Sequence, residues 1–316
     1  MTYEIGGHTI IIEGTERMLD ALLPSFVPFK VVTSKAETVI TSNEDHVVAS
    51  KAEPVITLTL SFGQDGSKPF TPEAGSHLIR DIDTGNGMTR VDKLSDGGYQ
   101  FLIRNIQGEK CALLTASPTF HSCHCRILCK GAYQQFALNN ALMIAYAFST
   151  ARRQTLLLHA SVIRYEGKAY AFTAPSGTGK STQVANWLTT IPGCDMINDD
   201  NPIIRIVDGQ PMLFGSPWSG KTPCYRNTQA PLGAIVKIAR DTTNHVSKMP
   251  PLQAFSTILS ACSSMKWDEE SYQDICTTTS AIIEKTGIYT LHCLPDPQSA
   301  IVCRDNITSH PSPVTC

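Results

Sequence analysis

Short hydrophobic runs broken by turn-forming residues fill the first part of the chain. Runs rich in β-branched and aromatic residues, bounded by glycine, serine or aspartate, are typical of strands. Four such runs predict strands at residues 8–12, 55–60, 99–103 and 112–115. We therefore expect a β-rich (α+β) N-terminal domain over residues 1–130.

A helical pattern follows this β-rich stretch. Hydrophobic side chains between Tyr133 and Phe148 recur at the 3.6-residue spacing of one helix face. We expect the helix to end near Arg152 and Arg153, because cations stabilise the C-terminal end of the helix dipole. The domain boundary is placed just before this helix, between Lys130 and Gly131.

From residue 156 onward, runs of strand length alternate with helical patterns. Strands are predicted at 156–163, 169–173, 196–200, 232–239, 289–294 and 300–304, and helices at 181–191, 252–262 and 269–286. Such alternation is typical of an α/β domain. We expect residues 131–316 to form that domain.

Composition narrows the class of protein. Of 316 residues, 42% are hydrophobic and 17% are charged, which is enough apolar material for a sizeable core. The 26 basic and 28 acidic residues nearly balance, whereas a nucleic-acid-binding protein usually carries a basic excess. No run of about 18 apolar residues predicts a membrane span, and the first residues lack the pattern of a secretory signal.

The 11 cysteines are scattered and odd in number, which does not suggest a disulfide framework. We expect reduced thiols and a cytoplasmic protein. The densest group, around Cys123, Cys125 and Cys129 with His121 and His124, favours buried structural residues over a metal site. Both interpretations stay open at this stage.

One internal repeat is visible. Residues 31–41 recur as residues 47–57 with nine of eleven positions identical. Two copies are too few for a solenoid. A local duplication that adds a strand or hairpin is expected, and a binding role is the alternative.

A glycine-rich loop carries the strongest chemical signal. The sequence APSGTGKST, residues 174–182, matches a phosphate-binding loop that has alanine in place of the first glycine. Glycines let the backbone N–H groups turn toward phosphate oxygens, the lysine neutralises the β- and γ-phosphates, and the hydroxyl after it ligates Mg²⁺. We therefore predict that ATP binds to Ser176, Gly177, Thr178, Gly179, Lys180, Ser181 and Thr182.

A second, formally stricter match occurs at residues 215–222, GSPWSGKT. A phosphate-binding loop needs a strand before it and a helix after it. Pro217 lies inside this second match and Pro223 follows it, so no helix is expected there. A loop that covers the active site through Trp218 and Lys221 remains the alternative.

Two adjacent carboxylates, Asp199 and Asp200, follow Lys180 by about one helix and one strand. If the strand at 196–200 runs parallel to the one before the loop, both strands end at the same edge of the sheet, where α/β proteins bind ligands. Phosphoryl transfer can use one carboxylate to hold Mg²⁺ with Ser181 and another to accept the proton of the attacking hydroxyl. A solvated turn is the alternative interpretation.

These motifs together resemble the HPr kinase/phosphorylase family, whose fold is the phosphoenolpyruvate-carboxykinase-like P-loop fold. The resemblance rests on HASVI (159–163), Gly167, the loop at 174–182 and INDDN (197–201), and it is closest to the stand-alone HPr-kinase-like proteins. It implies that His159 lies beside the transferred phosphoryl group. It also implies that the acid pair of the family corresponds to Asp199, as general base, and Asp200.

The sequence also departs from that family. The E-[IL]-R-G-x-G signature, with its metal-binding glutamate, is replaced by residues 213–222, LFGSPWSGKT. Phosphorylase activity and an HPr substrate are therefore not implied. Lys221 or Arg226 is a candidate for the positive charge at the transferred phosphate.

The sequence thus predicts an ATP- and Mg²⁺-dependent kinase. Lys180, Asp199 and His159 are its catalytic residues, and Ser181 and Asp200 are its metal ligands. The expected acceptor is a Ser/Thr hydroxyl of a peptide or small protein, and a small metabolite comes next. The alternatives are a nucleotide-binding regulatory module with little turnover and a carboxykinase-like enzyme. No nucleic-acid or membrane partner is expected, and the resemblance favours an assembly of copies.

Overall fold

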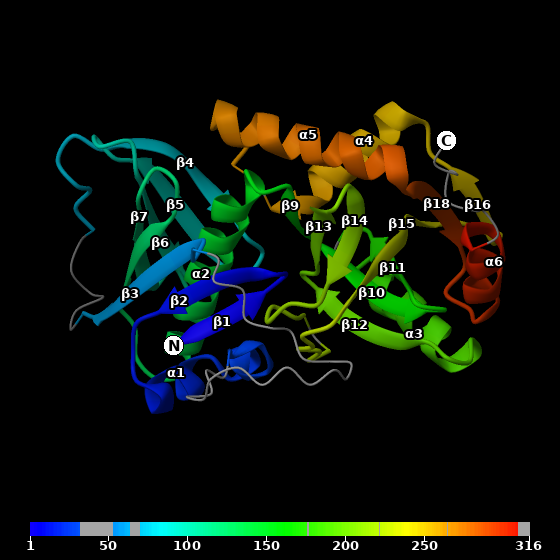
Figure 1. Ribbon diagram of the computed structural model, residues 1–316, viewed down its shortest axis with the longest axis horizontal. Coiled ribbons are helices and arrows are strands. Elements are labelled where there is room, and N and C mark those ends of the chain that lie inside the picture. The colour runs from blue at the N-terminus through cyan, green and yellow to red at the C-terminus, as the bar shows by residue number, and fades with distance from the viewer. Residues whose placement is uncertain (32–52, 64–69, 176, 221, 264, 309–316) are drawn as a thin grey trace, which may run out of the picture. The chain divides into compact units, whose positions relative to one another are not determined.

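The chain folds around two large mixed β-sheets, one in each of two units (Figure 1). The computed structural model describes residues 1–31, 53–63, 70–175, 177–220, 222–263 and 265–308. The units are Met1–Ala141 and Leu142–Cys316, so the division falls inside helix α2 (Tyr133–Ala151), whereas the sequence placed it before that helix. The first copy of the repeat lies almost entirely outside the described residues, as does half of the second.

The first unit holds an eight-stranded sheet in the order β1-β2-β3-β8-β7-β6-β5-β4. All four predicted strands are present, with small shifts at their ends. The strands are β1 (Thr2–Ile5), β2 (His8–Ile12), β3 (Ile56–Phe62), β4 (His77–Asp83), β5 (Met88–Lys93), β6 (Tyr99–Arg104), β7 (Lys110–Ala116) and β8 (Ser122–Ile127). A short helix, α1 (Glu16–Leu22), and a 3₁₀ turn, η1 (Pro24–Phe29), connect β2 to the segment before β3.

The second unit holds a ten-stranded sheet in the order β12-β10-β11-β15-β14-β13-β9-β17, and β18 pairs with both β15 and β16. The strands are β9 (Thr155–Leu158), β10 (Ala160–Tyr165), β11 (Lys168–Thr173), β12 (Asp195–Asp200), β13 (Ile203–Val207), β14 (Gln210–Phe214), β15 (Gln229–Arg240), β16 (His245–Lys248), β17 (Cys262–Ser263) and β18 (Gly287–Cys293). The helices are α3 (Lys180–Thr190), α4 (Pro251–Ala261), α5 (Glu269–Lys285) and α6 (Gln298–Ile307).

Strand direction brings four strand ends to one edge of this sheet. Strand β11 runs parallel to β15, and β15 runs parallel to β18. Strand β10 is antiparallel to both β11 and β12, so β12 runs in the same direction as β11. The parallel return predicted for the strand at 196–200 is confirmed, although the antiparallel β10 lies between the two strands.

Helices cover both faces of the second sheet. Trp187 of α3 is fully buried and stacks on Tyr170 of β11, in a cluster that also contains Cys303 of α6. On the other face, Ile258 of α4 and Ile282 of α5 belong to a second buried cluster. Trp187 is thus a core residue of the second unit.

Two predicted strands are wrong. The run at 156–163 is two strands, because the chain leaves β9 at Leu158 and enters β10 at Ala160. The run at 300–304 is part of helix α6, in which Ala300, Cys303 and Ile307 are buried at helical spacing. A five-residue apolar run is too short for its periodicity to separate strand from helix.

Candidate active site

The glycine-rich loop at 174–182, the candidate phosphate-binding loop, connects β11 to α3, the context that its motif requires. Gly177 and Gly179 have φ angles of 75° and 132°, which L side chains rarely adopt, and no atom occupies the space a side chain would take. No side chain caps the N-terminus of α3, so its first N–H groups and the positive end of its dipole are directed at the loop. Ser181 and Thr182 are exposed on the first turn, and Ser176 lies outside the described residues.

Three predicted site residues form a continuous polar chain. The Lys180 ammonium lies 2.8 Å from His159 Nε2, and it also donates to the carbonyl oxygen of Ala174. His159 Nδ1 lies 3.0 Å from Asp200 Oδ1. If Lys180 donates to Nε2, the imidazole is neutral and donates from Nδ1 to the carboxylate. Burial lowers the pKa of the Lys180 ammonium, and the charges of Asp200 and Asp199 oppose that shift.

The break between β9 and β10 positions His159. The backbone N–H of His159 donates to the carbonyl oxygen of Ala261, and its own carbonyl accepts from the Thr173 hydroxyl at the end of β11. Both ends of the residue are therefore held at the sheet edge where β11 and β12 terminate.

The two carboxylates of the acid pair have different surroundings. Asp199 is 5% exposed, and its Oδ1 accepts a 2.6 Å hydrogen bond from the Ser161 hydroxyl while Oδ2 accepts from Thr222 N at 3.2 Å. The Asp200 side chain is 33% exposed, and its Oδ2 accepts from the Asn201 amide. Asp200 has a φ of 107°, so the backbone is strained where β12 ends.

Residues 215–224, which carry the second loop match, lie against the acid pair. We call them the 215–224 loop. The Asn198 amide donates to the carbonyl oxygens of Ser216 and Trp218, and Gly220 N donates to the Asp199 carbonyl. No helix follows over the described residues 222–228, as predicted. Lys221 lies outside the described residues.

Arg226 does not reach this site. Its guanidinium is paired with Asp195 and the carbonyl of Met196, at the opposite end of β12 from Asp200. Arg164 pairs with the same carboxylate, and the two guanidinium groups hold the pKa of Asp195 below its usual value against the opposing effect of burial. The prediction that Arg226 supplies charge at the phosphate is therefore wrong, because Asp195 holds it elsewhere.

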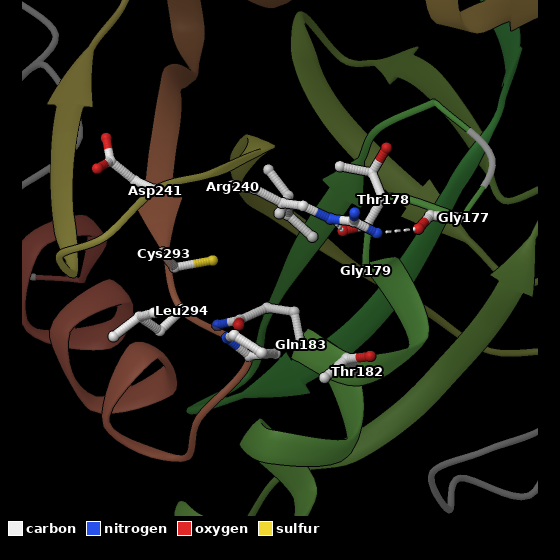
Figure 2. Close-up of a pocket in the computed structure, with 11 residues that line it drawn as sticks. Gly177, Thr178, Gly179, Thr182, Gln183, Arg240, Asp241, Cys293 and Leu294 are labelled. Atoms are coloured by element: carbon white, nitrogen blue, oxygen red, sulfur yellow. Dashed lines mark hydrogen bonds between the residues drawn. The ribbon is translucent and has the colours of Figure 1, made fainter.

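A pocket of about 380 Å³ adjoins the candidate phosphate-binding loop. Figure 2 shows Arg240, from the end of β15, reaching the loop, where its guanidinium donates to the carbonyls of Gly177 and Thr178. Cys293 and Leu294, at the end of β18, line the other side. Arg240 is not among the predicted site residues, although its place at the end of a strand parallel to β11 is a signal that could have identified it.

The cysteine-rich segment does not assemble a metal site among the described residues. Cys123 and Cys125 lie on the buried face of β8, and burial raises the pKa of each thiol to about 12. His124 faces the other way, toward Ser61. The ten described cysteines are free thiols, which favours the structural interpretation.

The residues described above are the basis for assigning function, because neither family models nor curated proteins provide a relative of this chain. No protein-family model matches the chain, and no curated protein matches it. Within the part of the chain that the structure describes, no helix has the length and apolar content needed to cross a membrane.

Proposed function

We propose that this protein is an ATP-dependent phosphotransferase that transfers the γ-phosphoryl group to a hydroxyl. The observation that carries the proposal is the chain of contacts from Lys180 through His159 to Asp200, beside a glycine-rich loop that precedes a helix. A lysine, an imidazole and a carboxylate at one sheet edge are the positioning and charge-neutralising groups that phosphoryl transfer requires. The HPr-kinase-like fold remains part of this proposal.

The residues of the glycine-rich loop at 174–182 fit a nucleoside triphosphate. The open space over Gly177 and Gly179, the uncapped helix and the neighbouring pocket together offer a phosphate cradle and room for a nucleoside. Bound ATP with Mg²⁺ would supply the phosphoryl group and a cation that neutralises its developing charge. Lys180 would exchange its contact with His159 for phosphate oxygens, and Arg240 would hold the loop from the pocket side.

Ser181 and Asp200 are the groups we assign to Mg²⁺. Both offer hard oxygen ligands, which Mg²⁺ prefers. Asp200 is the more exposed carboxylate of the acid pair, and its Oδ1 is held by His159. His159 therefore orients the carboxylate. Once Lys180 has moved, Nε2 would stabilise the transferred group only if it takes up a proton and donates it in a hydrogen bond to a phosphoryl oxygen.

Asp199 is the proposed general base. Its short bond to the Ser161 hydroxyl fixes Oδ1, whereas Oδ2 is held only by the longer bond from Thr222 N. Oδ2 is thus the less restrained oxygen, and it is the atom that we assign to accept the proton of the acceptor hydroxyl. Asp200 is the competing base because it is exposed already.

The test is ATP turnover with Mg²⁺, with and without pooled lysate peptides. Lys180→Ala, Asp199→Asn and Asp200→Asn should each lower transfer about 100-fold or more, whereas exposed Asp305→Asn on α6 should not. If Asp200 holds Mg²⁺, its variant will need more Mg²⁺, and the Asp199 variant will bind ATP·Mg²⁺ normally. ATP binding with no transfer to peptides or small metabolites would contradict the kinase and favour a regulatory module.

A further inference from the structure

A second group of polar side chains lies at the ends of β15, β16 and β18. His245 and His292 are directly opposed residues of the antiparallel β16–β18 pair. Their rings stack face to face, with centroids 4.5 Å apart and planes inclined by 3°. The register of the two strands therefore fixes two imidazoles side by side on one face of the sheet.

Asp241 completes the group. Its backbone N–H donates to the Cys293 carbonyl, and its Oδ1 accepts from Thr242 N at 2.6 Å. Its other oxygen, Oδ2, lies 3.4 Å from His292 Nδ1. One ligand atom from each of the three residues lies within 4.8 Å of the other two, and within the described residues no other His, Cys, Asp or Glu group of three meets that condition.

This arrangement suits a metal ion better than a hydrogen-bonded pair. Stacked imidazoles donate no hydrogen bond to each other, and they would repel if both were protonated. Ligand atoms around tetrahedral Zn²⁺ are about 3.3 Å apart, given Zn–N distances near 2.0 Å. The ligand atoms are already close to that spacing, but an ion lies in the plane of each imidazole that binds it, so the two rings would have to turn out of their parallel stack to share one ion. Two imidazole nitrogens and one carboxylate oxygen favour Zn²⁺ and its transition-metal neighbours over Mg²⁺.

We propose that Asp241, His245 and His292 form a transition-metal site of the Zn²⁺ class, separate from the phosphate-binding loop. The site lies at the rim of the pocket, because Asp241 also lines that pocket. Figure 2 shows the Asp241 carboxylate turned away from the loop side of the pocket. Three protein ligands leave a fourth tetrahedral position for water or for a ligand in the pocket.

The test is calorimetric titration of the metal-free full-length protein with Zn²⁺, together with absorption spectra of the Co²⁺ form. We expect one Zn²⁺ per chain. His292→Gln, His245→Gln and Asp241→Asn should each weaken its affinity about tenfold or more, since even residues behind direct ligands contribute that much. His77→Gln, an exposed histidine on β4, is the matched control and should leave the affinity unchanged.

Three results would overturn the proposal. Zn²⁺ affinity could be unaffected by the three variants. Co²⁺ could give the intense near-ultraviolet absorption of thiolate ligation, which would place the ion on cysteines. Affinity could fall only in His159→Gln, which would place the ion at the phosphate-binding loop. All the readouts are binding measurements, so absence of kinase activity would not affect them.

Discussion

At the residue scale, the site combines a strained backbone with a charged cluster. Asp200 adopts a positive φ at the point where its carboxylate contacts His159. Such conformations persist at functional sites because the surrounding contacts hold them, and each costs about 1–3 kcal/mol. The side-chain contacts to His159 and Asn201 and the backbone pairings with Ala160 and Ser219 hold Asp200.

This strain predicts opposite effects of glycine at two aspartates. Asp200→Gly should be more stable to urea than Asp200→Ala by about 1 kcal/mol, because glycine adopts positive φ freely. At Asp305, inside α6, glycine should instead be less stable than alanine by about 1 kcal/mol. Equal stabilities of the two Asp200 variants would show that the backbone there is unstrained.

Much of the residue-level chemistry could be predicted from the sequence. The predicted strand directions place Lys180 and the acid pair at one sheet edge, and the family resemblance implies that His159 lies there too. The contacts among Lys180, His159 and Asp200 agree with both expectations. The sequence could not show that Asp195 holds Arg226, because that depends on a register 31 residues apart. The sequence could have suggested Arg240, which directly follows the strand predicted at 232–239, but not its bonds to the loop carbonyls, which depend on the pairing of β11 with β15.

At the element scale, the 215–224 loop is held by close backbone approaches. A side chain at Gly215 would overlap the carbonyl oxygen of Arg226 and approach that of Ile197. At Gly220, a Cβ would lie 3.1 Å from the Cβ of Asp200. The close approach at Gly215 packs the loop against the backbone of Arg226, and the close approach at Gly220 packs the loop against Asp200 of the acid pair.

These two glycines should therefore separate stability from activity. Gly215→Ala should lower the free energy of unfolding by about 1–3 kcal/mol, as overpacking does. Gly220→Ala should cost less stability, because it meets a side chain, and should lower phosphoryl transfer instead. Chemical unfolding and turnover of both variants measure the two effects. Equal losses of stability would contradict this division.

The sequence predicted the type of element correctly where a hydrophobic pattern extended over many residues. The helices α2, α4 and α5 were predicted to within two or three residues at each end. The prediction of a single strand at 156–163 failed because both halves of the run are strand-like, and the sequence does not show the change of strand partner at His159. The run at 300–304 failed because burial at Ala300 and Cys303 follows helical spacing that five residues cannot display.

At the scale of the whole molecule, α2 crosses the division between the two units. Its C-terminal half belongs to the second unit, where Tyr146 packs on Trp218 at 5.2 Å and Phe148 packs on Trp267 at 6.0 Å. Because Trp218 is part of the 215–224 loop, the packing of Tyr146 on Trp218 lets α2 support the loop that lies against the acid pair. The sequence boundary at Lys130–Gly131 keeps this helix whole.

Truncation tests the role of α2. A fragment of residues 131–316 should unfold in one cooperative thermal transition, followed by near-ultraviolet circular dichroism. A fragment of residues 153–316 should lose that transition, because removing Tyr146 and Phe148 together costs about 5 kcal/mol or more, comparable with the whole stability of a domain. A cooperative transition at the same temperature in the shorter fragment would contradict this role.

The break at His159 also closes a circuit. Hydrogen bonds link β10 through β11, β15, β14 and β13 to β9, and the covalent chain returns from β9 to β10 through one residue. The peptide bonds of His159 therefore close a ring formed by these six strands. One extra residue inserted between β9 and β10 would leave every strand pairing intact and yet allow the imidazole to move away from Lys180 and Asp200. The length of this one-residue connection, as much as the identity of its side chain, keeps the histidine in place.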